Sequence, residues 1–381
     1  MTSTFIVAAA FLALIAALHV GTNILALTRC RLRTRPASPS EGAPAVSIVR
    51  PVCGLDNFLE ATLASSFYLD YPDYEVIFCV AQARDPAVPV VQRLIDAHPQ
   101  VRARLIVGDE RISANPKLNN CFKGWNAATH DWIVLADSNV LMPRDYLSRL
   151  MAAWRADTGL VCSPPVGTAP DGFWAHVECA FLNAHQARWQ YLAATVTAGF
   201  AQGKTMLWRR DILDAAGGIR VLGREAAEDA AATKVMRAAG LRVRLVDPPF
   251  PQPLGHRTAV DVWNRQVRWA QLRRASFPHL YAPEIFCGLL WPLVACAVAA
   301  TEAGLPLLPS LTACAALWYG TEMALARGAG WPAPLAYPLH AAIRDLMLPA
   351  LWVYGWVGSS FVWRGNAMSA DVTSETPIHE T

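Results

Sequence analysis

The chain has 381 residues, of which 54% are apolar and only 17% are charged, and its formal net charge is +3. A nearly balanced charge gives no reason to expect nucleic acid as a partner, and the charged fraction lies below the roughly 25% of an ordinary soluble domain. The nine cysteines show no metal-binding spacing, so we expect buried thiols in a reducing compartment. The composition favours two or three structural units, part of them in a membrane.

An apolar segment lies near the N-terminus. Residues 5–27 contain one titratable residue, His19, and about 20 apolar residues suffice to span a bilayer. Four arginines follow at alternate positions: Arg29, Arg31, Arg33 and Arg35. The positive-inside rule places them in the cytoplasm and the N-terminus outside. We predict a transmembrane anchor over residues 1–30, rather than a cleaved signal peptide, and a linker over residues 36–44.

Strands and helices alternate from residue 46 onward. Short apolar runs predict strands at residues 46–51, 74–80, 104–107 and 132–136, separated by helical patterns at residues 56–69, 89–98 and 117–128. Such βαβ units predict a parallel sheet with right-handed crossovers. No G-x-G-x-x-G motif follows the first strand, where Gly54 and Asp56 stand instead, so a standard dinucleotide-binding fold is not expected.

The last of these strands ends in a carboxylate, Asp137, with Asn139 two residues further on. Ligands of parallel sheets bind beyond the carboxyl ends of the strands. A hard divalent cation that bridges phosphates takes oxygen ligands of this kind. The alternative is an ordinary turn, because Asp, Ser and Asn are common turn residues.

The other polar candidates also have structural alternatives. Asp85 follows the second predicted strand, where it would hold a ribose or base, or begin a turn before Pro86. Glu228 and Asp229 open a predicted helix, where acidic residues commonly offset the helix dipole.

Basic and aromatic residues form a further group of candidates. Arg265, Arg268 and Trp269 form an R-x-x-R-W motif that is also typical of juxtamembrane residues at a lipid interface. His185 taken alone is more often structural than catalytic.

Uncharged segments return towards the C-terminus, at residues 285–301, 304–321 and 346–363. Their lengths of 17 or 18 residues are at the short limit for spanning a bilayer. Prolines interrupt them, so broken or re-entrant helices are expected. We predict a membrane region over residues 284–365, with residues 331–344 along the interface, and a polar tail over residues 366–381.

The order of these motifs after a membrane anchor resembles the inverting nucleotide-sugar glycosyltransferases with the D, D, D, (Q/R)xxRW signature. The phrases at residues 51–56, 69–76, 115–120, 211–218, 227–229 and 363–365 are similar to those of the ceramide glucosyltransferases. The resemblance covers about residues 46–365. It implies an α/β fold of the A-type glycosyltransferase class, with a nucleotide-sugar-binding mixed sheet flanked by helices over residues 45–280 and transmembrane helices at both ends.

The resemblance also implies a role for each matching residue. It makes Asp229 the catalytic base and assigns donor binding to Asp85, Lys117, Asp137, Arg265, Arg268 and Trp269. His185 and Glu228 are expected on the acceptor side, and Asp137 with Asn139 would hold Mg²⁺ or Mn²⁺. Asn139 departs from the family pattern, which has a second carboxylate there, and an amide binds a cation less strongly.

The implied reaction transfers a sugar, expected to be glucose from UDP-glucose, to the hydroxyl of ceramide with inversion. Overall similarity alone favours ceramide, and transfer of N-acetylglucosamine or another hexose to a hopanoid or other membrane lipid is the alternative. A remoter alternative is a non-enzymatic membrane protein with a degenerate nucleotide-binding domain. The Ala-, Arg- and Pro-rich composition suggests a bacterial inner membrane with a cytoplasmic catalytic domain, or a Golgi membrane in a eukaryote.

Overall fold

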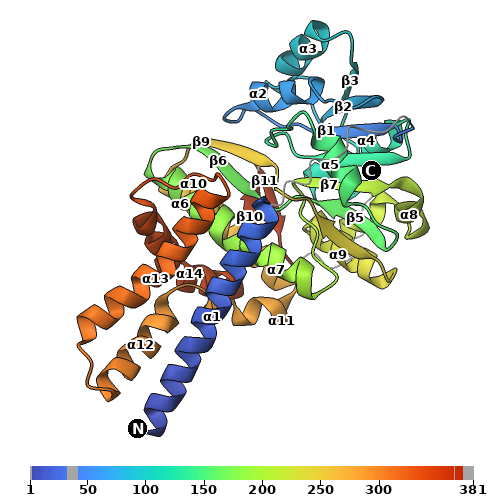
Figure 1. Cartoon of the computed structure of the whole chain (residues 1–381). Helices are drawn as coiled ribbons and strands as arrows, with labels where there is room; N and C mark the ends of the chain where they lie inside the picture. Colours follow the sequence, from blue (N-terminus) through green and yellow to red (C-terminus); the bar gives the residue numbers. More distant parts are fainter. Residues whose placement is uncertain (1, 32–41, 364, 372–381) are drawn as a thin grey trace. The chain divides into compact units, whose positions relative to one another are not determined.

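The computed structural model describes residues 2–31, 42–363 and 365–371 (Figure 1). These residues form two compact units. Unit 1 comprises Met1–Leu32, Val166–Leu192 and Leu254–Gly358, and unit 2 comprises Arg33–Pro165, Ala193–Pro253 and Ser359–Thr381. Arg33, Arg35, most of the expected linker and the tail from residue 372 lie outside the described residues.

Unit 2 is built on a seven-stranded sheet in the order β3-β2-β1-β4-β7-β5-β8. Its strands are β1 (Val46–Pro51), β2 (Tyr74–Val80), β3 (Arg102–Val107), β4 (Trp132–Ala136), β5 (Thr158–Cys162), β7 (Thr205–Arg209) and β8 (Arg242–Leu245). The first four are parallel, β7 is antiparallel to both β4 and β5, and β8 is parallel to β5. The predicted mixed sheet is therefore confirmed, and β1, β2 and β4 have the bounds expected from the sequence.

Helices connect these strands and cover the sheet. They are α2 (Leu59–Ala64), α3 (Val88–Ala97), α4 (Pro116–Ala127), α5 (Tyr146–Ala153), α8 (Arg210–Ala215) and α9 (Glu228–Ala238). The helix expected over residues 56–69 is shorter and continues as a 3₁₀ turn, η1 (Ser65–Phe67). All six residues of β1 are buried, as expected of a strand covered on both faces. Ile48, Val134 and Leu207 join neighbouring strands in one core cluster.

The strand order creates a switch point between β1 and β4. The chain runs from β1 outward to β2 and β3, and then returns to place β4 on the other side of β1. In open α/β sheets, ligands bind beyond the carboxyl ends of the strands at such a point. Asp85 follows β2 and Asp137 follows β4, so both candidate carboxylates lie at this edge of the sheet.

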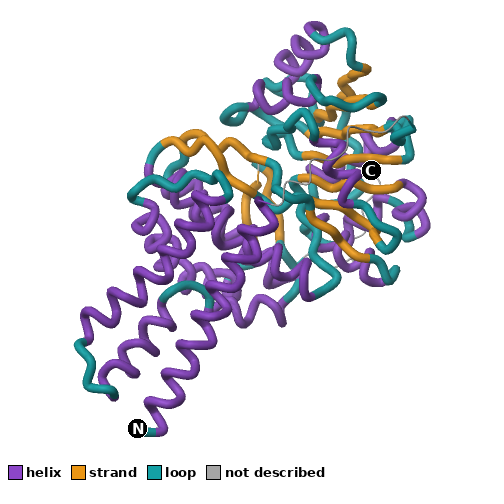
Figure 2. Tube along the Cα trace, viewed as in Figure 1, coloured by secondary structure: helices purple, strands orange, loops and turns teal. Residues whose placement is uncertain are grey.

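Unit 1 is mainly helical. Its elements are α1 (Ser3–Arg31), β6 (Val166–Asp171), α6 (Phe173–Cys179), the π-helix η2 (Ala180–Ala187), the end of β9 (Pro251–His256), α10 (Ala259–Ser276), α11 (Pro278–Tyr281), η4 (Ala282–Phe286), α12 (Leu290–Glu302), α13 (Leu307–Gly328) and α14 (Tyr337–Val357). Helices α1, α12 and α13 pack side by side (Figure 2). Val177, Val262 and Leu351 pack together, which joins α6, α10 and α14. Residues 166–192 and 254–280, expected in the cytosolic domain, thus pack with the C-terminal helices.

One described helix, α1, is long and apolar enough to cross a membrane, and the bent pair Pro278–Phe286 and Leu290–Glu302 would together form a second span. Helices α13 and α14 do not meet this criterion, so transmembrane roles for them stay a prediction. Both carry buried charges: Glu322, Arg344 and Asp345.

Residues 337–344, expected with residues 331–336 along the membrane interface, are the first turns of α14, and their place at an interface stays a prediction. The segment expected over residues 346–363 leaves the helix after Val357 and turns into the hairpin β10 (Ser360–Trp363) and β11 (Asn366–Ser369).

Candidate active site

Lys117 is the centre of an ion network in unit 2. It lies in the first turn of α4, and its Nζ is 2.6 Å from Asp137 Oδ1 and 2.5 Å from Glu228 Oε1. The same ammonium donates to the carbonyl oxygen of Gly203 over 2.6 Å. One side chain that is only 10% exposed therefore joins the end of β4, the start of α9 and the segment before β7.

Asp137 is held by two ammonium groups. Lys204 Nζ lies 2.9 Å from Asp137 Oδ2, on the carboxylate oxygen that Lys117 leaves free. Burial acts to raise the pKa of Asp137, but Lys117 and Lys204 outweigh it and hold the pKa at about 2. Asp137 and Glu228 likewise raise the pKa of Lys117, against the effect of burial. Lys117 and Asp137 are therefore both charged near neutral pH.

Glu228 is anchored through both of its carboxylate oxygens. Lys117 contacts Oε1, and the Asn115 side chain donates to Oε2 over 2.8 Å. The other end of the Asn115 amide accepts from the backbone N–H groups of Lys117 and Leu118, which caps α4. Glu228 thus joins the start of α9 to the start of α4 through an ion pair and a hydrogen bond.

Asp229 has a different environment from its neighbour. Its Oδ2 accepts from the Gly203 N–H over 3.0 Å, and its Oδ1 accepts from the Ala230 N–H over 2.9 Å. Burial and the charge of Glu228 raise the pKa of Asp229 to about 6, partly opposed by Lys117. A carboxylate with this pKa is mostly ionised at neutral pH and still basic enough to accept a proton.

Gly203 permits the close packing of these groups. A Cβ atom at this position would lie 2.7 Å from Glu228 Oε1 and 3.0 Å from Lys117 Nζ. Any side chain would therefore push the ion pair apart, which explains a glycine directly before Lys204.

Asp85 is a turn residue as well as a candidate ligand. Both of its oxygens lie 3.0 Å from the Gly54 N–H, and Oδ1 also accepts from the Ala87 N–H over 2.8 Å. The carboxylate therefore ties the loop after β1 to the loop after β2. Asp85 therefore does stabilise a turn, and it also lies at the edge of the sheet where a donor nucleotide is expected.

Asp137 and Asn139 offer oxygen ligands for a cation. The Oδ1 atom of Asn139 is buried, and no donor reaches it from the residues that the structure describes. Nowhere in the described part of the chain do three or more His, Cys, Asp or Glu side chains gather as a metal site. The pair thus fits a cation that takes most of its ligands from phosphates and water, as Mg²⁺ commonly does.

The remaining predicted residues lie in unit 1. Arg265 pairs with Glu178, whose other oxygen is 3.4 Å from Arg257 Nε. Trp269 packs against the cluster of Cys179, Leu182 and Leu254. Arg268 lies on the same helix, α10.

His185 is buried in the π-helix η2 of the same unit. Burial, together with Arg344 and Arg188, lowers its pKa well below the usual value, so the imidazole is neutral. The predicted residues therefore divide between the two units.

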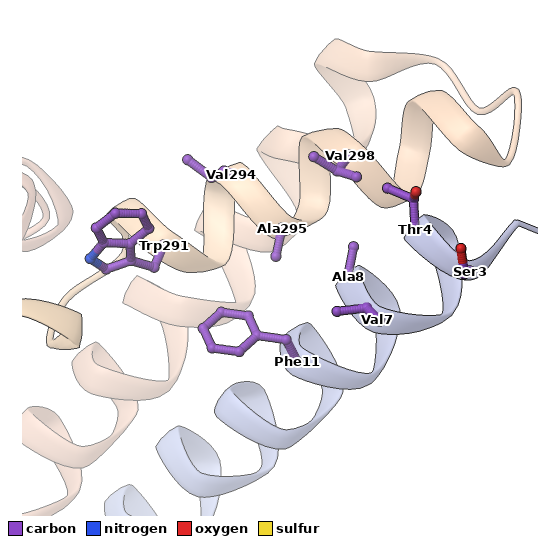
Figure 3. Close-up of a pocket in the computed structure, with 9 residues that line it drawn as sticks. All are labelled: Ser3, Thr4, Val7, Ala8, Phe11, Trp291, Val294, Ala295 and Val298. Atoms are coloured by element: carbon purple, nitrogen blue, oxygen red, sulfur yellow. The ribbon is translucent and has the colours of Figure 1, made fainter. Parts of the chain in front are cut away.

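A groove between α1 and α12 in unit 1 is almost wholly apolar (Figure 3). It is lined by Ser3, Thr4, Val7, Ala8, Phe11, Trp291, Val294, Ala295 and Val298. It contains no titratable side chain, so it offers neither an acid nor a base for catalysis.

Sequence reasoning missed Lys204, and it did not assign a role to Asn115. Asn115 could have been recognised, because Asn followed by Pro is a typical helix start. Lys204 carries no such signal, since its place depends on β7 pairing antiparallel with β4.

The model of glycosyl transferase family 21 matches residues 9–375 of this chain. Ceramide glucosyltransferase 1 of Caenorhabditis elegans is 28% identical over 248 residues, covering 65% of this chain and 53% of that protein. Ceramide glucosyltransferase 3 of the same organism is 26% identical over 352 residues, covering 90% and 77%. The chain thus spans about half the length of the first relative and about three quarters of the second.

Among solved structures, the mannosyltransferase PcManGT from Pyrobaculum calidifontis, in complex with GDP-Man and Mn²⁺, is 20% identical with a TM-score of 0.49. The match covers 88% of this chain and 98% of that one.

Proposed function

The chain belongs to glycosyl transferase family 21, and from this we propose that it is a membrane-bound inverting hexosyltransferase. The proposed reaction moves glucose from UDP-glucose to the hydroxyl of ceramide and gives a β-glucosylceramide. The observation that carries the proposal is the Lys117 network, because it gathers Asp137 and the Glu228–Asp229 pair in one place. These are two of the three acidic motifs of the signature.

Asp229 is the proposed catalytic base. Its raised pKa of about 6 suits proton abstraction from an acceptor hydroxyl at neutral pH. Direct displacement assisted by one base inverts the anomeric centre, so an α-linked donor gives a β-linked product. Glu228 is locked by Lys117 and Asn115, which favours Asp229 over its neighbour for this role.

The donor diphosphate is proposed to bind beside Asp137. Lys117 and Lys204 supply positive charge there, and Asp85 is proposed to contact the uridine. Mg²⁺ or Mn²⁺ held by Asp137 and Asn139 would neutralise charge on the departing UDP. Because both lysines occupy Asp137 in this structure, we expect at least one of them to shift towards the phosphates when the donor binds.

The residues of unit 1 are proposed to serve the donor and the acceptor. Arg265, Arg268 and Trp269 would close over the donor, and the neutral His185 would lie on the acceptor side. Ceramide is favoured by the names of the curated relatives. The apolar helix α1 supports an acceptor that stays in the bilayer. The orientation proposed from the basic residues after α1 places the catalytic domain in the cytoplasm.

The test is UDP release by the purified full-length protein in detergent. UDP-glucose, UDP-galactose and UDP-N-acetylglucosamine are each offered with ceramide, hopanoid or diacylglycerol, with Mg²⁺, with Mn²⁺ and with a chelator. Turnover with UDP-glucose and ceramide alone is the expected result. Turnover with UDP-N-acetylglucosamine and hopanoid would keep the mechanism and replace both substrates. No turnover with any pair, in folded protein, would contradict the proposed activity.

Asp229→Asn is the matched test of the base. The amide keeps the size of the side chain but cannot take a proton, so transfer should fall by about 100-fold or more. UDP affinity should stay within about twofold of the original, since Asp229 is proposed to act on the acceptor. Retention of a substantial fraction of the rate would remove Asp229 as the base.

A further inference from the structure

Arg50 is a fully buried guanidinium on β1, beside the proposed donor site. Its Nη1 donates to the carbonyl oxygen of Thr62 and to Ser66 Oγ, each over 2.6 Å. Among the described residues no carboxylate forms an ion pair with it. Burying a cation without a carboxylate partner costs free energy. We therefore expect Arg50 to do more than fill space in the core.

The other end of the guanidinium binds the turn that follows β4. Arg50 Nη2 donates to the carbonyl oxygens of Asp137 over 2.9 Å, Ser138 over 3.1 Å and Val140 over 2.9 Å. The Thr62 hydroxyl also donates to the Ser138 carbonyl oxygen, over 2.7 Å. The turn is thus held from one side by its carbonyl groups, and this is the turn that carries Asp137 and Asn139.

This arrangement determines the direction of two backbone donors. In a trans peptide the N–H points away from the C=O of the same peptide unit. Because the carbonyls of Asp137 and Ser138 point towards Arg50, the N–H groups of Ser138 and Asn139 point away from it. Neither of these N–H groups meets an acceptor within the described parts of the chain. Successive backbone N–H groups of this kind form an anion-binding concavity.

We propose that Arg50 is a positioning residue for the diphosphate of the sugar donor. It holds the turn at residues 137–140 so that the Ser138 and Asn139 N–H groups bind a phosphate oxygen beside Asp137. Its own positive charge lies behind the turn and favours the same anion. The inference rests on the proposed function in one respect, that the donor is a nucleoside diphosphate sugar.

The inference separates binding of the diphosphate from binding of the nucleoside. Arg50→Lys keeps the charge, but one ammonium cannot replace both Nη1, which binds Thr62 and Ser66, and Nη2, which binds the three carbonyls of the turn. We expect Arg50→Lys to weaken UDP binding by about 10-fold or more and uridine binding by less than about twofold. Thr62→Val removes the hydroxyl that contacts the Ser138 carbonyl and the helix carbonyls of Phe58 and Leu59, and leaves Arg50 in place. It should weaken UDP binding by about threefold, again with little effect on uridine.

The experiment measures the affinities of the full-length protein for uridine and for UDP, with Mg²⁺ present. Arg210→Lys is the matched control, because Arg210 also donates to two backbone carbonyls, those of Trp125 and Ala128, at the opposite end of α4 from Lys117. The ratio of UDP affinity to uridine affinity in Arg210→Lys should equal that of the original protein. In turnover, Arg50→Lys should raise the KM for the donor more than it lowers kcat.

Each outcome decides a defined point. Equal losses of uridine and UDP affinity in Arg50→Lys, or no loss of either, would overturn the inference. If Arg50→Lys does not fold, the ratio of UDP affinity to uridine affinity in Thr62→Val tests the inference instead. An original protein that does not prefer UDP to uridine would overturn the proposed donor class, and the inference with it. A preference for UDP that the variants leave unchanged would overturn the inference alone.

Discussion

Asp229 and Glu228 are adjacent in the sequence, but their side chains have different environments. Glu228 raises the pKa of Asp229 by its charge while it is itself fixed by Lys117 and Asn115. If Asp229 is the base, transfer requires its ionised form. The rate should therefore fall as the pH drops through about 6 and level off above it. A pH profile of kcat/KM that stays flat from pH 5 to 7.5 would contradict this assignment.

Glu228→Gln tests whether the charge of Glu228 raises the pKa of Asp229. The amide keeps the shape of the side chain but removes the negative charge that raises the pKa of Asp229. The pKa of Asp229 should fall, so the acid limb of the profile should move to lower pH by about half a unit or more. Activity at pH 5.5 relative to pH 7.5 should rise, even if the absolute rate is lower.

The control for this substitution is Glu225→Gln in the same segment. Glu225 is partly exposed and pairs with the exposed Lys234, so its charge is screened and the profile should not move. A profile of Glu228→Gln that shifts to higher pH would show that Glu228 does not act on Asp229 through its charge.

At the scale of the element, the start of α4 joins helix capping to the ion network. Asn115 accepts from two N–H groups of α4 and donates to Glu228 Oε2. Asp is normally as good a cap as Asn, whereas Ala costs about 0.5–2 kcal/mol. Here we expect the reverse order, because Asn115→Asp would place a second carboxylate against Glu228. Asn115→Asp should therefore unfold at a lower temperature than Asn115→Ala.

Thermal unfolding followed by tryptophan fluorescence measures this order. Thr258 caps α10 with its own side chain and contacts Asp261 within the capping box, so Thr258→Ala gives the cost of an ordinary cap. If Asn115→Asp unfolds at the same temperature as the original protein, the contact between Asn115 and Glu228 does not contribute to the stability of the fold.

The local pattern of apolar runs and turn residues predicts the bounds of some strands well and of others poorly. The bounds of β1, β2 and β4 could be predicted because these strands are continuous apolar runs between turn residues. β7 has only three apolar residues in a row, followed by Arg209, and β8 alternates arginines with apolar residues, so neither contains such a run. Asp137 and Asp229 were found as motifs, whereas Lys204 and Arg50 act through partners that are distant in sequence. Their contacts depend on the order of the strands in the sheet, which the local periodicity of the sequence does not predict.

At the scale of the whole molecule, each unit has a buried ion network of its own. In unit 1, Arg344 donates to Glu322 Oε2 over 2.9 Å and to Asp345 Oδ1 over 2.8 Å. Arg188 Nη2 lies 4.0 Å from Glu322 Oε1. These four side chains are all at most 6% exposed, and their two positive and two negative charges cancel. The network connects α13, α14 and the start of α7 (Arg188–Val196) within one unit.

Glu322→Gln should destabilise unit 1 without affecting the proposed donor site. The substitution leaves Arg344 and Arg188 with one buried carboxylate, and breaking a buried ion network in this way costs about 3–5 kcal/mol. The unfolding temperature should fall by about 5 °C or more. UDP affinity should stay within about twofold, because Asp85, Lys117 and Asp137 all belong to unit 2.

The control is Glu302→Gln in the same unit. Glu302 is exposed and contacts only Thr2 in the described residues, so the unfolding temperature should not change. If Glu322→Gln lost UDP binding at a temperature where it is folded, the proposed donor site would depend on this ion network. The prediction that the substitution affects stability alone would then be wrong. A stable Glu322→Gln would instead show that the buried charges of unit 1 contribute little to its folding, as when apolar packing dominates.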